Sequence, residues 1–467
     1  MLTYDLSQVP KGALYEHLYK YIRNDIKNGV LKAGEKLPSK RTLAKNLGVS
    51  TITVESAYAQ LMSEGYVYSL PKRGYYISKI DTTAQLPHAE RSADIVLPKE
   101  KTRYAVDFSN TQTDPSNFPF ATWKKLLRET IADNSQALME KSPAGGVYAL
   151  KAAIANHLHA FRGMEVDPNQ IIVGAGTEYL YGILIQLLGR DKVYCAENPG
   201  YQKVPQIYRA QEVECRFADM DEGGISVSGL RRVGADIAHI GPTHQFPTGV
   251  TMPVSRRYEL LAWASEDDNR FIIEDDYDSE FRLQGKPIPT LQGLDAGSKV
   301  VYLNTFAKSL SSTVRISYMV LPVTLVNRFY KELGFYACTV SNFEQFTLAR
   351  FINEGYFEKH INRMRLHYIR QRQTILDAIG ASRLSGRCDI IEQDSGLHVI
   401  LALHTNKSDS TLQAALAAHS IHLAALSEYY NVQTPKSSHR FLLSYSNPGH
   451  LDTDTLISAL NTIADCL

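Results

Sequence analysis

The first 80 residues alternate apolar and polar positions in a way that predicts three short helices. Through residues 12–29, apolar side chains recur every four residues, which is the spacing of one helix face. Ser39 and Ser50 are suited to cap two further helices, because a serine hydroxyl accepts a hydrogen bond from an N–H group of the first turn. The second helix is expected to run to Leu47, and the third is expected to end at Gly65.

Two short strands are expected after the third helix, at residues 66–69 and 75–78. Three helices followed by a hairpin indicate a winged helix-turn-helix, which places a mainly α domain at residues 1–80. Residues 81–103 show neither helical nor strand periodicity and contain two prolines. They are therefore expected to be a linker.

Strand-like runs alternate with helical stretches from residue 104 to residue 467, which indicates an α/β domain with a mainly parallel sheet. The expected strands lie at residues 170–173, 192–195, 236–240, 271–273 and 300–303. From about residue 340, helices are followed by strands near 397–403 and 440–444. This is the pattern of a small C-terminal α+β subdomain.

The distribution of charge separates these two regions. The chain has 467 residues with 50 Lys and Arg against 49 Asp and Glu, yet residues 1–80 hold 12 basic and 6 acidic residues. A basic head on an acidic body is expected of a DNA-binding module, although a solvated surface would give the same imbalance. The five cysteines are scattered and include no CxxC pair, which favours a reducing compartment. We also see no signal peptide and no long apolar run, and we therefore expect a cytoplasmic protein.

The start of the third helix is the expected base-reading element, because the second helix of a helix-turn-helix pair enters the major groove. We therefore expect base contacts from Ser50, Thr51, Thr53 and Glu55. Phosphate contacts are expected from basic residues on either side, namely Lys40 and Arg41 before the turn and Lys72 and Arg73 at the wing tip. A solvated surface is the alternative for each charge taken singly.

The segment LPSKRTLAKNLGVSTITVESAYAQLMSEGYVYSLPKRGYYI resembles the winged helix of GntR-type bacterial regulators. The similarity lies in LPS-x-R, in the turn LGVS and in Gly74 of the wing. This resemblance implies a double-stranded DNA operator as a partner. Thr51 stands where the family often has arginine, so the resemblance does not extend to the operator sequence.

The second region contains, in order, the residues that pyridoxal phosphate needs. FIIEDDYDSEF places Asp275 and Asp276 at the end of an apolar strand, Lys308 follows the next predicted strand, and Arg315 lies seven residues later. A lysine that carries this cofactor needs a carboxylate at the pyridine nitrogen, and a cation and backbone N–H groups for the phosphate. Taken singly, each residue is more common at a surface or turn. Together they indicate one cofactor site.

In this order the residues resemble fold-type I pyridoxal-phosphate aminotransferases over residues 104–467. The resemblance implies that Lys308 holds the cofactor as an internal aldimine and that Asp275, in preference to Asp276, meets the pyridine nitrogen. It also implies a set of ring and phosphate contacts: Tyr277 at the phenolic oxygen, Tyr201 stacked on the ring, and Arg315, Thr305, Gly176, Thr177 and Glu178 at the phosphate.

A GntR-type head joined to such a body is typical of the MocR/GabR family of transcription factors, whose TPSHQFPTG motif is similar to GPTHQFPTG here. Aminotransferases have NPTG at this turn, and Phe246 replaces its asparagine. His244 or Gln245 is therefore expected near the ring, with a structural turn as the alternative for His244. The resemblance also implies a homodimer, typically head-to-tail.

The residue that binds the substrate carboxylate distinguishes an enzyme from a sensor. Aminotransferases hold this group with an arginine near the C-terminus, because a guanidinium binds a carboxylate through two hydrogen bonds. RFLLSYSNPG places Leu442 at that position, with Arg440 two residues earlier on the same strand face. GabR-like proteins have a second carboxylate-binding arginine, and Lys203 occupies its position here. A regulator without sustained transamination is therefore expected.

These departures resemble the PdxR-type subset, whose members sense pyridoxal phosphate and control vitamin B6 synthesis. Under this hypothesis Lys308 is a reversible covalent receptor and the cofactor is the signal. Two alternatives stay open. One is a GabR-like regulator that keeps the cofactor as a prosthetic group and senses an amine or amino acid, and the other, less favoured, is a working aminotransferase.

Overall fold

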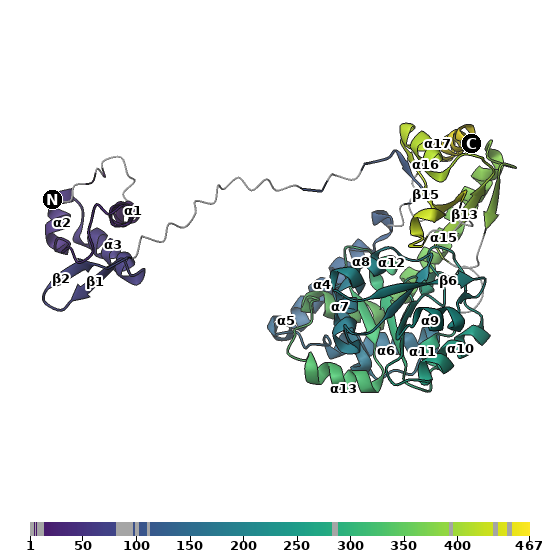
Figure 1. The fold of residues 1–467 in the computed structure, drawn as a ribbon, viewed down its shortest axis with the longest axis horizontal. Coiled ribbons are helices and arrows are strands. Elements are labelled where there is room, and N and C mark those ends of the chain that lie inside the picture. Colours follow the sequence, from purple (N-terminus) through teal and green to yellow (C-terminus); the bar gives the residue numbers. More distant parts are fainter. Residues whose placement is uncertain are drawn as a thin grey trace. The chain divides into compact units, whose positions relative to one another are not determined.

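The structure is a computed structural model that describes Tyr4, Leu6 and residues 14–80, 97–98, 102–109, 113–282, 288–391, 396–432, 438–445 and 451–467. The chain divides into two compact units, a head (Met1–Glu100) and a body (Lys101–Leu467), which are described separately (Figure 1). Most of the linker expected at residues 81–103 lies outside the described residues.

The head contains the elements expected of a winged helix-turn-helix. Its helices are α1 (Leu14–Lys27), α2 (Lys40–Leu47) and α3 (Thr51–Ser63), and its antiparallel hairpin is β1 (Val67–Leu70) with β2 (Gly74–Ile77). Ser39 and Ser50 cap α2 and α3 as expected. The apolar residues that face one another across α1 and α3 are fully buried: Leu18, Ile22, Val54, Ala57, Tyr58 and Leu61.

The body is built on an eight-stranded sheet in the order β4-β11-β10-β9-β8-β5-β6-β7. These strands are β4 (Ile171–Gly174), β5 (Tyr194–Asn198), β6 (Cys215–Asp221), β7 (Gly224–Ile225), β8 (Ile237–Ile240), β9 (Phe271–Asp275), β10 (Val300–Thr305) and β11 (Ser317–Val320). β10, β9, β8, β5 and β6 run parallel. β11 is antiparallel to both of its neighbours, so the sheet is mixed, and the sequence did not predict this strand, β6 or β7.

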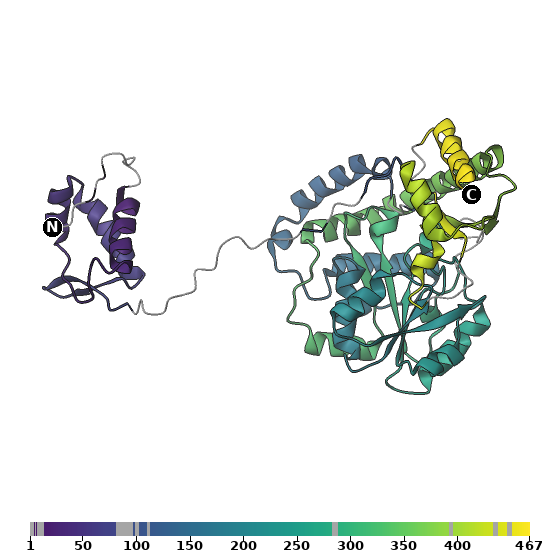
Figure 2. The same cartoon turned by 45° about the horizontal axis from the view of Figure 1, so that its top comes forward.

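Helices cover both faces of the sheet, as Figures 1 and 2 show. They include α4 (Phe120–Asp133), α5 (Ser135–Met139), α6 (Tyr148–Arg162), α7 (Thr177–Leu188), α8 (Lys203–Ala210), α9 (Val227–Val233), α10 (Val254–Ser265), α11 (Leu291–Leu294), α12 (Phe306–Ser309), α13 (Val323–Glu332) and α14 (Asn342–Asn353). On β10, Val301 and Leu303 pack into one apolar cluster, whereas Tyr302 packs into another. Burial on both faces explains the nearly continuous apolar runs of the central strands.

A smaller subdomain follows the long helix α15 (Tyr356–Ala381) and lies at one end of the body (Figure 2). Its antiparallel sheet has the order β12-β13-β16-β15, formed by Cys388–Ile391, His398–Leu403, Arg440–Ser444 and Ala424–Ala425. Its helices are α16 (Asp409–Ala418) and α17 (Thr453–Cys466). β3 (Val106–Asp107) pairs in parallel with β14 (Ile421–His422), so the start of the body joins its C-terminal part.

Within the described ranges, no helix is both long enough and apolar enough to cross a membrane. The same residues include no cluster of three or more His, Cys, Asp or Glu side chains suited to a metal ion.

Candidate functional site

A cavity of about 400 Å³ lies at the carboxyl ends of the parallel strands. Ligands commonly bind at this edge of an α/β sheet. The residues that line it include nine of the ten proposed from the sequence for the cofactor: Lys308, Asp275, Tyr277, Tyr201, Arg315, Thr305, Gly176, Thr177 and Glu178. The tenth, His244, lies behind Tyr277.

Asp275 presents a carboxylate to this cavity. Its Oδ2 atom accepts a hydrogen bond from the Tyr181 hydroxyl at 2.5 Å and lies 3.5 Å from Nε2 of His239. Its Oδ1 atom is buried and has no hydrogen-bond partner among the described residues. A buried carboxylate oxygen without a partner is costly, and a protonated pyridine nitrogen would satisfy it. This side chain therefore fits the ring end of pyridoxal phosphate.

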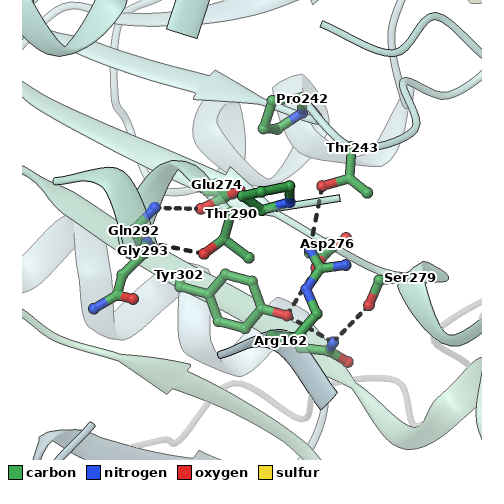
Figure 3. Close-up of polar contacts among 12 residues, drawn as sticks. Arg162, Pro242, Thr243, Glu274, Asp276, Ser279, Thr290, Gln292, Gly293 and Tyr302 are labelled. Carbon is green, nitrogen blue, oxygen red and sulfur yellow. Dashed lines mark hydrogen bonds and ion pairs between the residues drawn. The ribbon is translucent and has the colours of Figure 1, made fainter. Parts of the chain in front are cut away.

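Successive side chains of a strand point to opposite faces, and Asp276 points toward Arg162 and Tyr302, as Figure 3 shows. Its Oδ2 atom accepts hydrogen bonds from Nη2 of Arg162 and from the Tyr302 hydroxyl, both at 2.8 Å. Both charged side chains are about 1% exposed, so this is a buried ion pair. On the same face, Glu274 accepts backbone hydrogen bonds at the start of α11, and burial raises its pKa to about 7. Asp276 is thus engaged in the structure of the body.

Lys308 has the electrostatic setting of a reactive amine. It lies on α12, a single turn whose N-terminus is capped by Thr305. Burial lowers the pKa of Lys308 to about 8, although Asp278 partly opposes the shift. A lower pKa increases the fraction of neutral amine, which is the nucleophile needed for attack on an aldehyde. The lysine therefore fits the aldehyde of pyridoxal phosphate.

The start of α7 and Arg315 form the cradle expected for a phosphate. The helix begins at Thr177, so the N–H groups of its first turn have no acceptor within the helix and favour an anion. Gly176 has φ = +93°, and a Cβ atom there would lie 2.5 Å from Nη2 of Arg315. Only glycine therefore lets the guanidinium approach the helix start. Arg315 contacts Glu178 through its Nη2 atom at 2.8 Å.

The hydroxyl of Thr305 is largely engaged within the protein. It accepts hydrogen bonds from the backbone N–H of Ala307 at 3.1 Å and from the Ser317 hydroxyl at 2.8 Å. Thr305 lines the cavity, but the hydrogen bonds of its hydroxyl cap α12.

His244 and Gln245 hold the turn beside the cavity. Nδ1 of His244 lies 3.0 Å from the Tyr277 hydroxyl and 2.9 Å from Oδ2 of Asp278, so His244 contacts two residues that line the cavity without lining it itself. The Gln245 amide donates to the Pro199 carbonyl at 2.9 Å, which makes it a structural residue of the turn. Tyr201 is 47% exposed at the opening of the cavity, and its ring packs edge-on against Phe246 at 6.0 Å.

Neither of the two positions expected to bind a substrate carboxylate places an arginine at the cavity. Leu442 is 2% exposed within β16, and Arg440 is exposed and does not line the cavity. Lys203 does line it, but its Nζ atom lies 2.5 Å from Oε1 of Glu178.

Other cavity residues were not identified from the sequence. Tyr181 lies one helical turn after Thr177, and this spacing was the available signal for it. His239, Glu197 and His398 come from β8, β5 and β13, so only the folded sheet brings them together. Burial raises the pKa of Glu197 to about 8 and lowers that of His398 to about 4, so both side chains are mostly neutral at pH 7.

In the head, the side chains proposed for DNA contacts lie on α2, α3 and the wing. The Ser50 hydroxyl accepts from the Thr53 backbone N–H at 3.0 Å and lies 2.8 Å from the Thr53 hydroxyl, so both side chains take part in capping α3. Thr51 is exposed. Of the basic residues, Lys40 lies 2.5 Å from Glu55, whereas Arg41, Lys72 and Arg73 are exposed.

Comparison with known families assigns both units. The family "Bacterial regulatory proteins, gntR family" matches residues 14–77, and "Aminotransferase class I and II" matches residues 108–453. The kynurenine aminotransferase of Pyrococcus horikoshii superposes with a TM-score of 0.67 and 21% identity, covering 81% of this chain and 96% of that chain. This likeness establishes the aminotransferase fold of the body.

Relatives that align with nearly the whole chain are named as regulators. The HTH-type transcriptional regulator YhdI of Bacillus subtilis is 37% identical, covering 99% of this chain and 98% of its own. The probable rhizopine catabolism regulatory protein MocR of Rhizobium meliloti is 30% identical, covering 96% and 93%. The pyridoxine biosynthesis regulator PdxR of Corynebacterium glutamicum is 28% identical, covering 96% and 95%. The chain therefore belongs to the MocR/GabR family of transcriptional regulators, in which a GntR-type winged helix is fused to an aminotransferase-like domain whose cofactor is pyridoxal phosphate.

Proposed function

We propose that this regulator senses pyridoxal 5'-phosphate itself, through covalent attachment at Lys308, and controls genes of vitamin B6 synthesis. The observation that carries this proposal is the contrast between the groups available for the cofactor and the residue at the expected position of a substrate carboxylate. The ring and aldehyde ends have fitting groups in Asp275 and Lys308, whereas the expected carboxylate position is a buried leucine, Leu442. The similarity to PdxR over nearly the whole chain also supports it.

Different residues of the cavity would hold different parts of the cofactor. Asp275 would hold the proton of the pyridine nitrogen, and its own position is fixed by Tyr181. The start of α7 and Arg315 would hold the phosphate, and Tyr201 would cover the ring. Bound pyridoxal phosphate supplies an aldehyde for the lysine and a ring that withdraws electrons. Because a ligand shifts an equilibrium only through different affinities for two states, occupancy of this site must favour one arrangement of the regulator.

The partners proposed with this function are an operator in double-stranded DNA and a second copy of the chain. A homodimer, head-to-tail as in the family, would present two heads to two half-sites. We propose Thr51, Arg41, Lys72 and Arg73 as DNA contacts, together with Lys40, Ser50 and Thr53, and we place the regulator in the cytoplasm. The domain limits 1–80 and 104–467, joined by a linker over 81–103, belong to the same proposal.

The test is a titration of the full-length apo-protein with pyridoxal phosphate, followed by visible absorption and by binding to a selected operator. We expect micromolar cofactor to produce the visible absorption band of the lysine-bound cofactor. The same concentration should change DNA binding without an added amine. Lys308→Ala should abolish both effects. Unchanged DNA binding on complete occupancy of the site would refute the sensor proposal.

A second candidate is a regulator that keeps the cofactor bound and senses an amine. The observation in its favour is an aromatic wall on one side of the cavity, where Phe246 packs edge-on against Tyr201, Tyr277 and His398. This wall offers an apolar surface and ring faces that attract a cation. The second candidate is supported if DNA binding changes only when an amine alters the spectrum of the bound cofactor.

A further inference from the structure

Three charged residues form a chain of ion pairs at the phosphate end of the cavity. Oε1 of Glu178 lies 2.5 Å from Nζ of Lys203, and Oε2 lies 2.8 Å from Nη2 of Arg315. All three side chains line the cavity and are between 39% and 52% exposed, so solvent and dissolved ligands reach them.

The Glu178 carboxylate is held by Lys203 and by Arg315, the guanidinium assigned to the phosphate in the proposed cradle. Glu178 is the second residue of α7, where the helix dipole stabilises a negative charge. Hydrogen bonds from Lys203 and Arg315 lower the pKa of Glu178, so the carboxylate is ionised at neutral pH. Here a fixed anion occupies the guanidinium of the proposed phosphate cradle.

We propose that Glu178 sets the affinity of the site for phosphate-bearing ligands by competing with the ligand phosphate for Arg315. This inference rests on the proposed function, because it makes the cofactor exchangeable. In this proposal the phosphate takes over Nη2 of Arg315 and displaces one carboxylate oxygen from it. The other oxygen stays with Lys203, so the displaced carboxylate keeps a charged partner. Lys203 thereby acts as a positioning residue that lowers the cost of displacement.

The opposite role for Glu178 makes a different prediction. If the carboxylate merely orients Arg315 toward the ligand, then its removal leaves the guanidinium disordered and weakens phosphate binding. If it competes, its removal strengthens phosphate binding. The sign of the change in affinity therefore decides between the two roles.

The experiment compares pyridoxal phosphate with pyridoxal, which lacks the phosphate, on the full-length apo-protein without DNA. The readout is the dissociation constant from visible absorption. We expect Glu178→Gln to bind pyridoxal phosphate about five-fold more tightly, the upper range for a half-exposed ion pair, and to bind pyridoxal as the wild type does. Glu332→Gln is the matched control, because Glu332 also pairs with an arginine, Arg328 at 3.0 Å, but lies outside this cavity.

A double-mutant cycle separates the role of Lys203 from direct phosphate contact. Lys203→Met should weaken binding of pyridoxal phosphate in the wild type, because Glu178 then has Arg315 as its remaining partner. In the Glu178→Gln background the same change should have little effect. A full effect in both backgrounds would overturn the positioning role.

The outcomes distinguish this inference from the proposed function. If wild-type protein binds the cofactor and changes its DNA binding, but Glu178→Gln binds equally or more weakly, only the competition is refuted. If Glu178→Gln tightens binding but occupancy leaves DNA binding unchanged, the competition stands and the sensor proposal fails. Thermal unfolding of each variant checks folding, and Glu178→Ala provides a second removal of the carboxylate.

Discussion

Asp275 and Asp276 are adjacent in the sequence, but their carboxylates lie on opposite faces of the strand end. Asp275 accepts from Tyr181 beside the cavity, whereas Asp276 forms a buried ion pair with Arg162 (Figure 3). One carboxylate therefore has an atom available for a ligand, and the other is needed to neutralise a buried guanidinium.

This relationship predicts opposite effects of two matched substitutions. Asp276→Asn should destabilise the body by about 3–5 kcal/mol, because removing one partner leaves a buried charge uncompensated. Asp275→Asn should leave stability nearly unchanged and weaken the binding of pyridoxal phosphate. Urea unfolding and cofactor titration measure the two effects. Equal destabilisation by both substitutions would contradict the assignment of Asp275 to the ligand.

The lowered pKa of Lys308 predicts how cofactor attachment depends on pH. Below pH 8 the amine is mostly protonated, so the second-order rate of attachment should rise roughly tenfold per pH unit. Above about pH 8 the amine is mostly neutral, and the contribution of Lys308 should level off. Stopped-flow absorption of the apo-protein with pyridoxal phosphate measures this profile. A rise that continues toward pH 10 would show that burial does not depress the pKa in solution.

The periodicity of the chain predicted the fold because most elements are specified locally. In the head, caps at Ser39 and Ser50 and the apolar spacing of α1 and α3 determine the helix limits. In the body, the central strands were recognisable because they are apolar on both faces. β6 was not, since its burial is mixed, and β11 was missed although it is four buried residues long like β4 and β8.

The cofactor site was predicted as a set of residues but not as a network. The motifs identified Lys308 and Asp275, yet the ion pair of Glu178 with Arg315 joins residues 137 positions apart. The contact of Asp275 with Tyr181 also depends on how α7 packs against the sheet. Such partners are determined by tertiary structure, which a single sequence does not display. For Ser50 the sequence indicated both capping and DNA contact, whereas for Thr53 it indicated DNA contact alone; the structure shows both side chains in the cap of α3.

Gly396 is expected to be essential for packing between the C-terminal subdomain and the cavity. It has φ = +92°, and a Cβ atom there would lie 1.8 Å from Cε1 of His244. Gly396→Ala should therefore destabilise the body by about 1–3 kcal/mol and disturb Tyr277, which contacts His244. Gly380→Ala is the control, because nothing lies within 4 Å of that position on α15, and it should stabilise by up to about 1 kcal/mol. Thermal unfolding that ranks the two variants equally would contradict this packing.

The wing provides a prediction for DNA binding that needs no knowledge of the operator sequence. Arg73 is exposed at the hairpin tip, where a cation would neutralise a backbone phosphate and release a counterion. Arg73→Ala should therefore reduce the slope of log K against log salt by about 0.9 for each bound head, with similar losses on different sequences. Fluorescence anisotropy with labelled duplexes at several salt concentrations measures this slope.

Two further variants make the test specific to the wing. Arg231→Ala removes an exposed basic residue of the body, 2.5 Å from Glu266, and should leave the slope unchanged. Thr51→Ala, at the first position of α3, should alter preference among sequences while keeping the salt dependence, because base contacts carry sequence information and phosphate contacts do not. If Arg73→Ala instead changed sequence preference at constant slope, the wing would read bases, and the division of labour between α3 and the hairpin would be reversed.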